Sequence, residues 1–289
     1  MLRIAHIINP VIVDEISDLH FAQPVTFESM RLAQEFAEGY SAVELYSAQY
    51  PEDCSLVPTF MTRTRDLDHS VLDVGNFQKQ RKLPLIKDIL DRLYEISHAD
   101  YFIYTNVDIA LLPHFYLTVS QLVGTGIDGM IINRRTIVSF PSEPELIPLM
   151  WAQVGEKHPG YDCFVFRREA YPDFDLGTAC IGANWIGRVM LANVHANAKN
   201  FKIFEDFHLT FHLGDDRSWK IPDFLDYDEH NQNELLRILT RFKEEGKFKD
   251  RPLLEKFLKD IHQTYTAQDG QQKECESSRR LPWWKFGGK

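Results

Sequence analysis

The sequence predicts an α/β fold with a mostly parallel sheet, helices on both faces and a C-terminal helical extension. Two patterns carry this prediction. Short apolar runs alternate with amphipathic segments through the first half of the chain, which is typical of parallel strands joined by helical crossovers. Beyond residue 230 the pattern changes to two amphipathic stretches, near 233–244 and 252–265, without strand signals.

Residues 1–96 contain four strand or helix signals in order. Residues 2–8 are apolar, rich in β-branched side chains, and stop at Asn9-Pro10, which predicts a buried strand. Thr26 and Gly39 are suited to cap a helix over 26–38, and a second strand follows at 42–48. Residues 51–82 are polar and receive no assignment. The segment from Pro84 repeats apolar pairs every four residues, which predicts a helix.

The strongest strand signal is the apolar run Tyr101-Phe102-Ile103-Tyr104, which predicts a central strand. It ends abruptly in Thr105-Asn106-Val107-Asp108. Further along, the pattern predicts helices over 113–123, 142–154 and 185–194, and strands at 129–133, 162–168 and within 201–213. We therefore expect a domain over 1–225, a helical extension packed on it over 226–266, and a polar to aromatic-basic tail over 267–289.

Composition excludes several classes of protein. The 32 basic and 42 acidic residues give a formal net charge of −10, which argues against broad nucleic-acid or anionic-membrane binding. The four cysteines form no C-x-x-C pair, so reduced thiols are expected. Met1–Val13 lacks the pattern of a signal peptide and no apolar stretch could span a bilayer, so we expect a cytoplasmic protein. The aromatic-basic tail leaves weak contact with a membrane surface open.

A glycine motif at 124–129 matches G-x-G-x-x-G, but its context is wrong for dinucleotide binding. That site needs a strand before the glycines and a helix after them, whereas here the predicted order is reversed. We interpret the motif as a helix-to-strand turn. The sequence also lacks a Walker loop, H-E-x-x-H and G-x-S-x-G, the commonest signatures of NTPases, metalloproteases and α/β-hydrolases.

Asn106 and Asp108 follow a buried strand at positions i and i+2. If the chain stays extended there, both side chains point the same way, toward the crevice at the carboxyl ends of the strands. Their oxygens suit Mg²⁺ or Mn²⁺, which take one or two carboxylates and complete their shell with water and phosphate. The alternative is that Asp108 only caps the next helix.

The segment His212-Leu213-Gly214-Asp215-Asp216-Arg217-Ser218-Trp219 follows another apolar stretch. The His212 imidazole could complete a metal site, and Arg217 could neutralise phosphate oxygens. The alternative is a polar turn after a strand.

Together these segments resemble the GT-A fold of nucleotide-sugar glycosyltransferases over roughly residues 1–220. In that superfamily a strand ends in an Asp-x-Asp-type motif that holds Mn²⁺ or Mg²⁺ against the donor diphosphate. Asn106 stands at its first acidic position and Asp108 at the position that usually contacts the metal most directly. Gly214, Arg217 and Trp219 are in step with the His-x-x-Gly-x-x-Lys-x-Trp signature of glycogenin-type retaining enzymes, whereas His212 is shifted by one residue.

The resemblance implies roles for further residues, each of which could equally be structural. Asn9 and Tyr46, at the ends of the first two strands, would flank the nucleoside, and Arg81 or Lys82 would reach the diphosphate. On the acceptor side, Asp162 would orient or deprotonate a hydroxyl. Asn184 and Trp185 would contact the acceptor.

We therefore expect a metal-dependent glycosyltransferase that moves a sugar from a nucleotide-diphosphate donor to a hydroxyl acceptor, with a leaning toward retention of configuration. Asp108, Asn106 and His212 would hold the cation, and Arg217 would stabilise the leaving group. Two alternatives stay open. A sugar-phosphate nucleotidyltransferase would usually carry a glycine-rich N-terminal loop, and residues 6–14 contain no glycine. A non-catalytic carbohydrate- or partner-binding protein with a degenerate transferase fold would account for Asn106 and the shifted histidine.

Overall fold

The computed structural model describes residues 1–214 and 224–263. Its main element is a seven-stranded sheet in which every neighbouring pair is parallel except the two pairs that involve β9. This confirms the predicted mostly parallel α/β sheet. In sheet order the strands are β10 (Phe201–Phe204), β6 (Gly129–Ile132), β9 (Cys163–Arg167), β4 (Tyr101–Thr105), β1 (Leu2–Ile8), β2 (Ser41–Ser47) and β3 (Thr62–Arg63).

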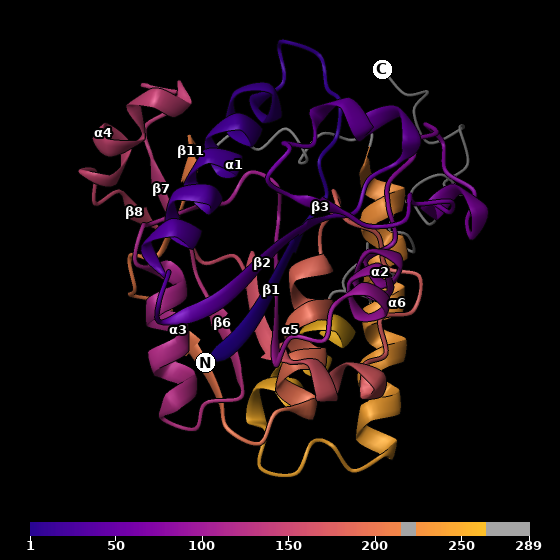
Figure 1. Cartoon of the computed structure of the whole chain (residues 1–289). Helices are drawn as coiled ribbons and strands as arrows, with labels where there is room; N and C mark the ends of the chain where they lie inside the picture. Colours follow the sequence, from indigo (N-terminus) through magenta and orange to yellow (C-terminus); the bar gives the residue numbers. More distant parts are fainter. Residues whose placement is uncertain (215–223, 264–289) are drawn as a thin grey trace, which may run out of the picture.

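Helices cover both faces of this sheet (Figure 1). On one face α1 (Asp18–Phe36) and α3 (Phe115–Gly124) pack against the sheet through a shared apolar cluster. On the other face a larger cluster joins α2 (Ile86–Ile96), α5 (Ile186–Asn197), α6 (Leu225–Glu244) and the helical residues 252–263. The C-terminal helices therefore share one core with the α/β part.

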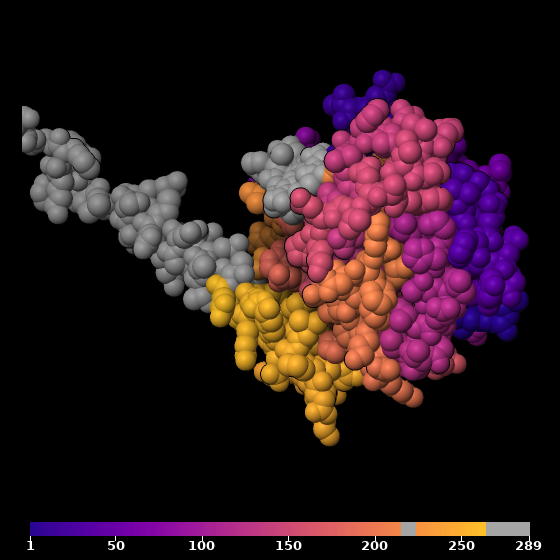
Figure 2. Space-filling model, turned by 90° about the vertical axis from the view of Figure 1, so that its left-hand side faces the viewer, coloured from indigo at the N-terminus to yellow at the C-terminus, as the bar shows by residue number. Residues whose placement is uncertain are grey.

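A second, four-stranded sheet lies beside the first, in the order β5 (Ala110–Leu111), β11 (Thr210–Leu213), β7 (Arg135–Ile137) and β8 (Glu156–Lys157). The short helix α4 (Ile147–Trp151) packs against it. Figure 2 shows the segment around 140–160 as a mass at the top of the molecule. Four 3₁₀ turns complete the described elements, η1 (Pro51–Leu56), η2 (Val71–Asp73), η3 (Pro144–Leu146) and η4 (Arg168–Asp173).

Four predicted elements differ in extent from the structure. The helix expected over 26–38 begins at Asp18, because Ala22 and Val25 extend its buried stripe across Pro24. The helix expected over 142–154 shortens to η3 and α4, whose prolines lack the N–H that a longer helix needs. The helix expected near 233–244 begins at Leu225. The apolar stretch 201–213, in which one or two strands were expected, divides between the two sheets as β10 and β11.

The glycine motif lies in the predicted context. Helix α3 ends at Gly124, strand β6 begins at Gly129, and Gly126 adopts a φ of 94° in the turn between them. The order is helix, turn, strand, so the dinucleotide interpretation is correctly rejected. No helix among the described residues is both apolar enough and long enough to cross a bilayer. Cys54, Cys163 and Cys180 are free thiols.

Candidate functional site

The chain changes direction across the sheet between β1 and β4. Strands β2 and β3 lie on one side of β1, and the chain then crosses to place β4 on its other side. In open α/β sheets the carboxyl ends of the strands at such a switch point border the ligand-binding crevice. Here Asn9 follows β1, while Asn106 and Asp108 follow β4. The topology therefore brings predicted site residues to one edge.

Asp108 and His212 meet at this edge across two sheets. His212 lies on β11, and its Nε2 is 3.2 Å from Oδ2 of Asp108. Its Nδ1–H donates to the Gly214 carbonyl oxygen at 2.8 Å, which leaves Nε2 directed at the carboxylate. Both residues are mostly buried, with side chains 8% and 22% exposed for His212 and Asp108. His212 is shifted by one residue relative to the glycogenin-type signature, but its side chain still faces Asp108.

The electrostatics of this pair follow from burial and mutual attraction. Burial would raise the pKa of Asp108, but the hydrogen bond with His212 and the nearby charges of His212 and Arg134 hold it below its usual value. Burial and Arg134 would lower the pKa of His212, but Asp108 raises it above its usual value. The anionic form of Asp108 and the protonated, positively charged form of His212 therefore stabilise each other.

Asn106 does not share this orientation. The chain turns after β4, with the Ile109 N–H donating to the Asn106 carbonyl at 3.2 Å, so the expectation of an extended i, i+2 pair is wrong. The Asn106 amide accepts from the Tyr104 hydroxyl at 3.2 Å and donates to Asp162 at 3.3 Å. A turn rotates side chains away from strand alternation, and Asn106 thereby faces the neighbouring strand β9.

Arg134 is the main site residue that sequence reasoning missed. It follows β6 at the same edge, and its Nη1 donates to Asp162 Oδ2 at 2.7 Å, with both side chains 12% exposed. Its Nη2 lies 3.2 Å from His158 Nε2. The available signal was a basic residue directly after the predicted strand 129–133, equivalent in position to Asn106 after β4. Both carboxylate oxygens of Asp162 are therefore engaged, one by Arg134 and one by Asn106.

Several buried polar atoms at this edge have no hydrogen-bond partner. They are Asp108 Oδ1, Asn133 Oδ1 and Arg134 Nε. Buried polar groups are normally paired, because an unpaired one carries the full cost of its desolvation, about 1–3 kcal/mol. Two acceptor atoms and one donor atom of a cationic side chain at this edge are thus available to a polar ligand.

The Asp108–His212 pair fits a divalent cation as two of its ligands. Two ligands at right angles around an ion, each about 2.1 Å from it, lie about 3 Å apart, close to the distance between these atoms. A carboxylate with one imidazole suits Mn²⁺, and phosphate oxygens and water would complete the shell. Within the described residues no group of three or more His, Cys, Asp or Glu could hold a metal alone. The described residues would therefore supply two of the ligands of a cation held here.

Asn9 and Tyr46 differ in what their side chains can reach. Asn9 is buried, and its amide donates to the Ala48 carbonyl at 2.6 Å, which ties the ends of β1 and β2 together at the edge. Tyr46 packs in the core beneath the sheet, and its hydroxyl donates to Glu44, two residues back along β2. The Tyr46 hydroxyl thus points away from the carboxyl edge.

Arg81 and Lys82 are both held by aromatic rings. The guanidinium of Arg81 lies 4.0 Å from the Phe224 ring centroid, at the start of α6. The ammonium of Lys82 lies 3.8 Å from the Tyr50 ring centroid and forms an ion pair with Glu52. Such stacking orients a cationic side chain and does not occupy all of its N–H hydrogen-bond donors.

Asn184 and Trp185 lie where α5 begins. Asn184 bonds Asp228 of α6 through its backbone N–H, at 2.7 Å, and through its side-chain amide. Trp185 is half-buried and adopts the left-handed conformation with φ of 72°. Arg217, Trp219 and the aromatic-basic tail lie outside the described residues.

The opposite edge of the sheet also contains a cavity, with a volume of about 190 Å³. Its lining includes Asp128, Phe166, Arg167 and Lys199, and none of the predicted site residues. The Asp128 carboxylate accepts from the backbone N–H groups of Lys199 and Asn200 at 3.1 and 2.7 Å. These polar groups are satisfied within the chain, so the cavity carries no comparable ligand signal.

Comparison with known proteins gives similarity at the level of the fold. No protein-family model matches the chain, and no curated protein sequence matches it. Among solved structures it is similar to S. aureus TarS 1–349, with a TM-score of 0.50 and 9% identity, over 93% of this chain and 74% of that chain. Structures of TarS 1–349 in complex with UDP and with UDP-GlcNAc match with TM-scores of 0.47 and 0.44 at 8% identity. They cover 82% of this chain, and 66% and 67% of theirs.

The similarity to TarS and the observed topology confirm the fold class expected from the sequence. A mostly parallel α/β sheet flanked by helices is present, as the predicted GT-A-like fold class requires.

Proposed function

We propose that the chain is a metal-dependent glycosyltransferase that uses a nucleotide-diphosphate sugar. The observation that carries the proposal is the cluster of incomplete polar groups beside the Asp108–His212 pair, at the switch point of the sheet. This cluster contains an anionic group that suits a cation and a cationic group that suits phosphate. A cation–diphosphate complex satisfies both at once.

Each charged group then has a role toward the donor. Asp108 and His212 hold Mn²⁺ or Mg²⁺, which supplies Lewis-acid stabilisation of the leaving diphosphate when bound. Arg134 donates to phosphate oxygens, a geometry that its planar guanidinium suits. Arg217, Arg81 and Lys82 remain further candidates for the diphosphate. Asn106 does not bind the cation in this proposal, because its side-chain amide is hydrogen-bonded to Tyr104 and Asp162.

The nucleoside and the acceptor lie on either side of this centre in the proposal. Asn9 borders the nucleoside, and Tyr46 supports the strand beneath it. Asp162 both binds Arg134 and faces the acceptor. Asn184 and Trp185 contact the acceptor molecule that carries the reacting hydroxyl group. Retention of configuration and a cytoplasmic location stay predictions from the sequence. TarS itself has been solved with UDP and with UDP-GlcNAc, which makes these two compounds the natural probes.

One observation favours a different candidate, a non-catalytic carbohydrate-binding protein with a degenerate transferase fold. Asn106 is neutral and is turned toward Asp162, so the metal position has one carboxylate where the Asp-x-Asp motif has two. Such a protein would bind a nucleotide sugar or its sugar part without cleaving it.

Turnover of UDP-GlcNAc with water as acceptor, measured with and without Mn²⁺, tests the proposal. We expect slow release of UDP that requires Mn²⁺ and that the Asp108→Asn variant loses. The Glu169→Gln variant is the matched control, because it removes an 85% exposed carboxylate near the opposite edge of the sheet. Binding of UDP-GlcNAc without any release of UDP would favour the non-catalytic candidate. Absence of both binding and release with this donor, and with other nucleotide-diphosphate sugars, would contradict the proposal.

A further inference from the structure

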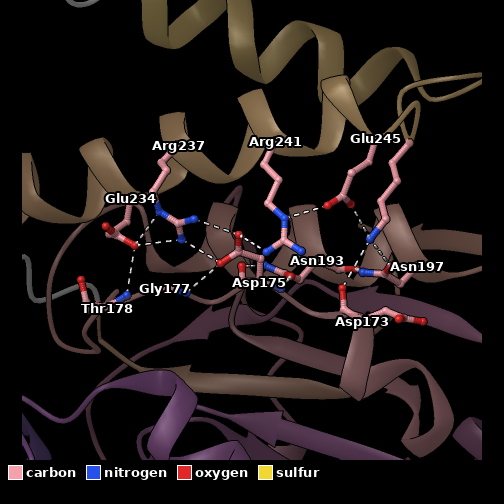
Figure 3. A network of polar contacts seen from close by, with 11 residues as sticks. Asp173, Asp175, Gly177, Thr178, Asn193, Asn197, Glu234, Arg237, Arg241 and Glu245 are labelled. Carbon is pink, nitrogen blue, oxygen red and sulfur yellow. Dashed lines mark hydrogen bonds and ion pairs between the residues drawn. The ribbon is translucent and has the colours of Figure 1, made fainter.

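Helix α6 carries a row of polar side chains along the face that meets the loop 175–184. The row recurs every three or four residues, the spacing that places side chains on one side of a helix. The adjoining side of the helix packs Leu235, Ile238 and Leu239 into the core. Figure 3 shows part of the row directed at the loop. Its members are Asp228, Asn231, Glu234, Arg237 and Arg241.

The row holds the start of the loop through Asp175. Arg237 donates to both oxygens of the Asp175 carboxylate, at 2.9 and 2.7 Å, and Arg241 donates to one of them at 3.0 Å. From α5, the buried Asn193 binds the Asp175 backbone on both sides, accepting from its N–H at 2.6 Å and donating to its carbonyl at 2.7 Å. Asp175 is thus fixed from two helices (Figure 3).

The middle of the loop lies close against α6. Glu234 accepts from the Thr178 backbone N–H at 3.0 Å. A Cβ atom at Gly177 would come within 1.7 Å of the Glu234 carboxylate, and the residue has a φ of 52°, so glycine is needed there. The loop backbone therefore touches the carboxylate directly.

The end of the loop is bound in the same way by Asn231 and Asp228. The buried Asn231 accepts from the Cys180 N–H and donates to the carbonyls of Cys180 and Asn184, each at 2.9 Å. Asp228 accepts from the Asn184 N–H at 2.7 Å and, through its other oxygen, from the Asn184 side chain. All five contacts act on the backbone of Cys180 or on Asn184, the residue immediately before Trp185.

Trp185 adopts a conformation that a bulky residue rarely takes. Its φ of 72° lies in the left-handed region, which costs a non-glycine residue about 1–2 kcal/mol. Such strain persists only where the surroundings impose it, and it is found preferentially at functional sites. The ring lies beside Arg188, whose guanidinium is 4.7 Å from its centroid.

We propose that Asp228 is a positioning residue, which holds Asn184 and thereby keeps Trp185 in its left-handed conformation on the acceptor side of the site. This inference rests on the proposed function, since Asn184 and Trp185 are its acceptor-binding residues. Helix α6 is then a template for the loop 175–184, and the loop presents Trp185 to a hydroxyl-bearing acceptor. Asp228 itself touches neither donor nor acceptor.

The Asp228→Asn variant tests this role with little change in shape. The new amide keeps one acceptor for the Asn184 N–H but places an NH₂ group against the NH₂ group of Asn184. We expect turnover of UDP-GlcNAc with glycerol, a hydroxyl-bearing acceptor, to fall by about tenfold to 100-fold, the size of effect that misplacement near reacting groups causes. Release of UDP with water as acceptor should change by less than about twofold. The affinity for UDP should stay within about twofold. The control is Glu229→Gln, an exposed neighbour on α6 that loses the same charge.

A second variant separates positioning from simple loss of stability. Exchanging the pair, with Asp228→Asn and Asn184→Asp together, restores one donor opposite one acceptor and should recover turnover at least partly. Turnover in Asp228→Asn equal to that in Glu229→Gln would overturn the proposal, and so would a loss of UDP affinity equal to the loss of turnover.

Amide hydrogen exchange keeps the inference testable if the wild-type protein does not act on UDP-GlcNAc. We expect the Asn184 amide to exchange at least tenfold faster in Asp228→Asn than in Glu229→Gln, because its acceptor changes from a carboxylate to a neutral amide oxygen and the two facing NH₂ groups repel each other. Equal exchange rates would refute the positioning role on their own. Faster exchange combined with an inactive wild-type protein would leave the template intact and contradict only the proposed function.

Discussion

Two polar regions of the molecule differ in how far their groups are satisfied. Where α6 meets the loop 175–184, Asp175 has partners on two helices and Asn231 uses all its polar atoms on backbone groups. At the carboxyl edge of the sheet, Asp108 has one paired oxygen and one without a partner, and Arg134 has a buried Nε without one. The carboxylates at the two centres are both mostly buried, with side chains 8% exposed for Asp175 and 22% for Asp108, so their exposure does not explain the difference.

The contrast distinguishes a structural cluster from a binding cluster. A satisfied network fixes one backbone shape, because any change leaves a buried group unpaired. An unsatisfied cluster retains a free-energy cost that a ligand of the right charge removes. Substitutions in the first region should therefore change stability or loop position, while substitutions in the second should change ligand affinity. The following predictions test that division.

The largest effect is expected at the unsatisfied edge. Asp108→Asn removes the negative charge that binds the cation, and Mn²⁺-dependent turnover should fall by about 100-fold or more, beyond the range seen for supporting residues of metal sites. Thermal unfolding should show a Tm close to that of the wild type, because the side chain already has an unpaired oxygen. A variant that unfolds several degrees lower would show that Asp108 belongs to the structural kind of cluster.

The reverse pattern is expected for Asp175→Asn. Loss of the carboxylate weakens the contacts to Arg237 and Arg241, and we expect the free energy of unfolding to drop by about 1.5–3 kcal/mol at pH 7, as for hydrogen bonds to charged groups. Urea denaturation measures this change. The affinity for UDP should be unchanged, and a loss of affinity without loss of stability would contradict the division.

The same variant has a defined pH dependence. Burial would raise the pKa of Asp175, but the hydrogen bonds and charges of Arg237 and Arg241 outweigh burial and lower it. The stabilisation is therefore fully present above the unfolded-state pKa of about 3.9 and disappears as pH falls through the lower folded-state pKa. The difference in stability between wild type and variant should shrink below about pH 4. A difference that stays constant between pH 7 and pH 3 would exclude the ion pair as its cause.

A smaller effect is expected for Arg134→Lys. Lysine keeps the positive charge but lacks the planar guanidinium, whose separate N–H groups can bind Asp162 and a phosphate oxygen at the same time in fixed directions. The Kd for UDP in the presence of Mn²⁺ should rise about tenfold, measured by calorimetry. Arg167→Lys, at the opposite edge, serves as the control, and an equal rise in both variants would remove Arg134 from the site.

The smallest effect is expected for Asn106→Asp. The Asn106 side chain is turned toward Tyr104 and Asp162, so an added carboxylate does not join Asp108 at the cation. The affinity for Mn²⁺ without nucleotide should change by less than about threefold. A tenfold gain would show that Asn106 reaches the cation and that its orientation changes when metal binds.

Sequence patterns predicted the order of strands and helices well, because apolar runs in a parallel sheet are buried on both faces and stand out. They also selected Asp108, which follows β4, and His212, which lies on β11, and the two side chains meet at one edge of the sheet. The patterns could not reveal the turn at 106–109, which is set by tertiary contacts with Asp162. They also missed Arg134, since a single basic residue after a strand is indistinguishable from surface charge until its partner on another strand is known.

The row of polar side chains on α6, like Arg134, could not be predicted from the sequence. Asp228 and Asn231 precede the helix that the sequence predicts near 233–244, and their partners lie on a loop nearly fifty residues earlier. Contacts between a side chain and distant backbone groups cannot be predicted from the pattern of residue types along the sequence. The left-handed conformation of Trp185 was also unforeseeable, since tryptophan has no preference for that region.

Titration of UDP into the protein with and without Mn²⁺ tests the central claim most directly. Asp108 and His212 supply two ligands, so the cation and the diphosphate should each complete the other's site, and by linkage each should raise the other's affinity. Calorimetry should give weak binding of Mn²⁺ alone, and a Kd for UDP at least about tenfold lower with Mn²⁺ than without it. In Asp108→Asn the effect of Mn²⁺ should vanish. The same UDP affinity with and without Mn²⁺ in the wild-type protein would contradict the account.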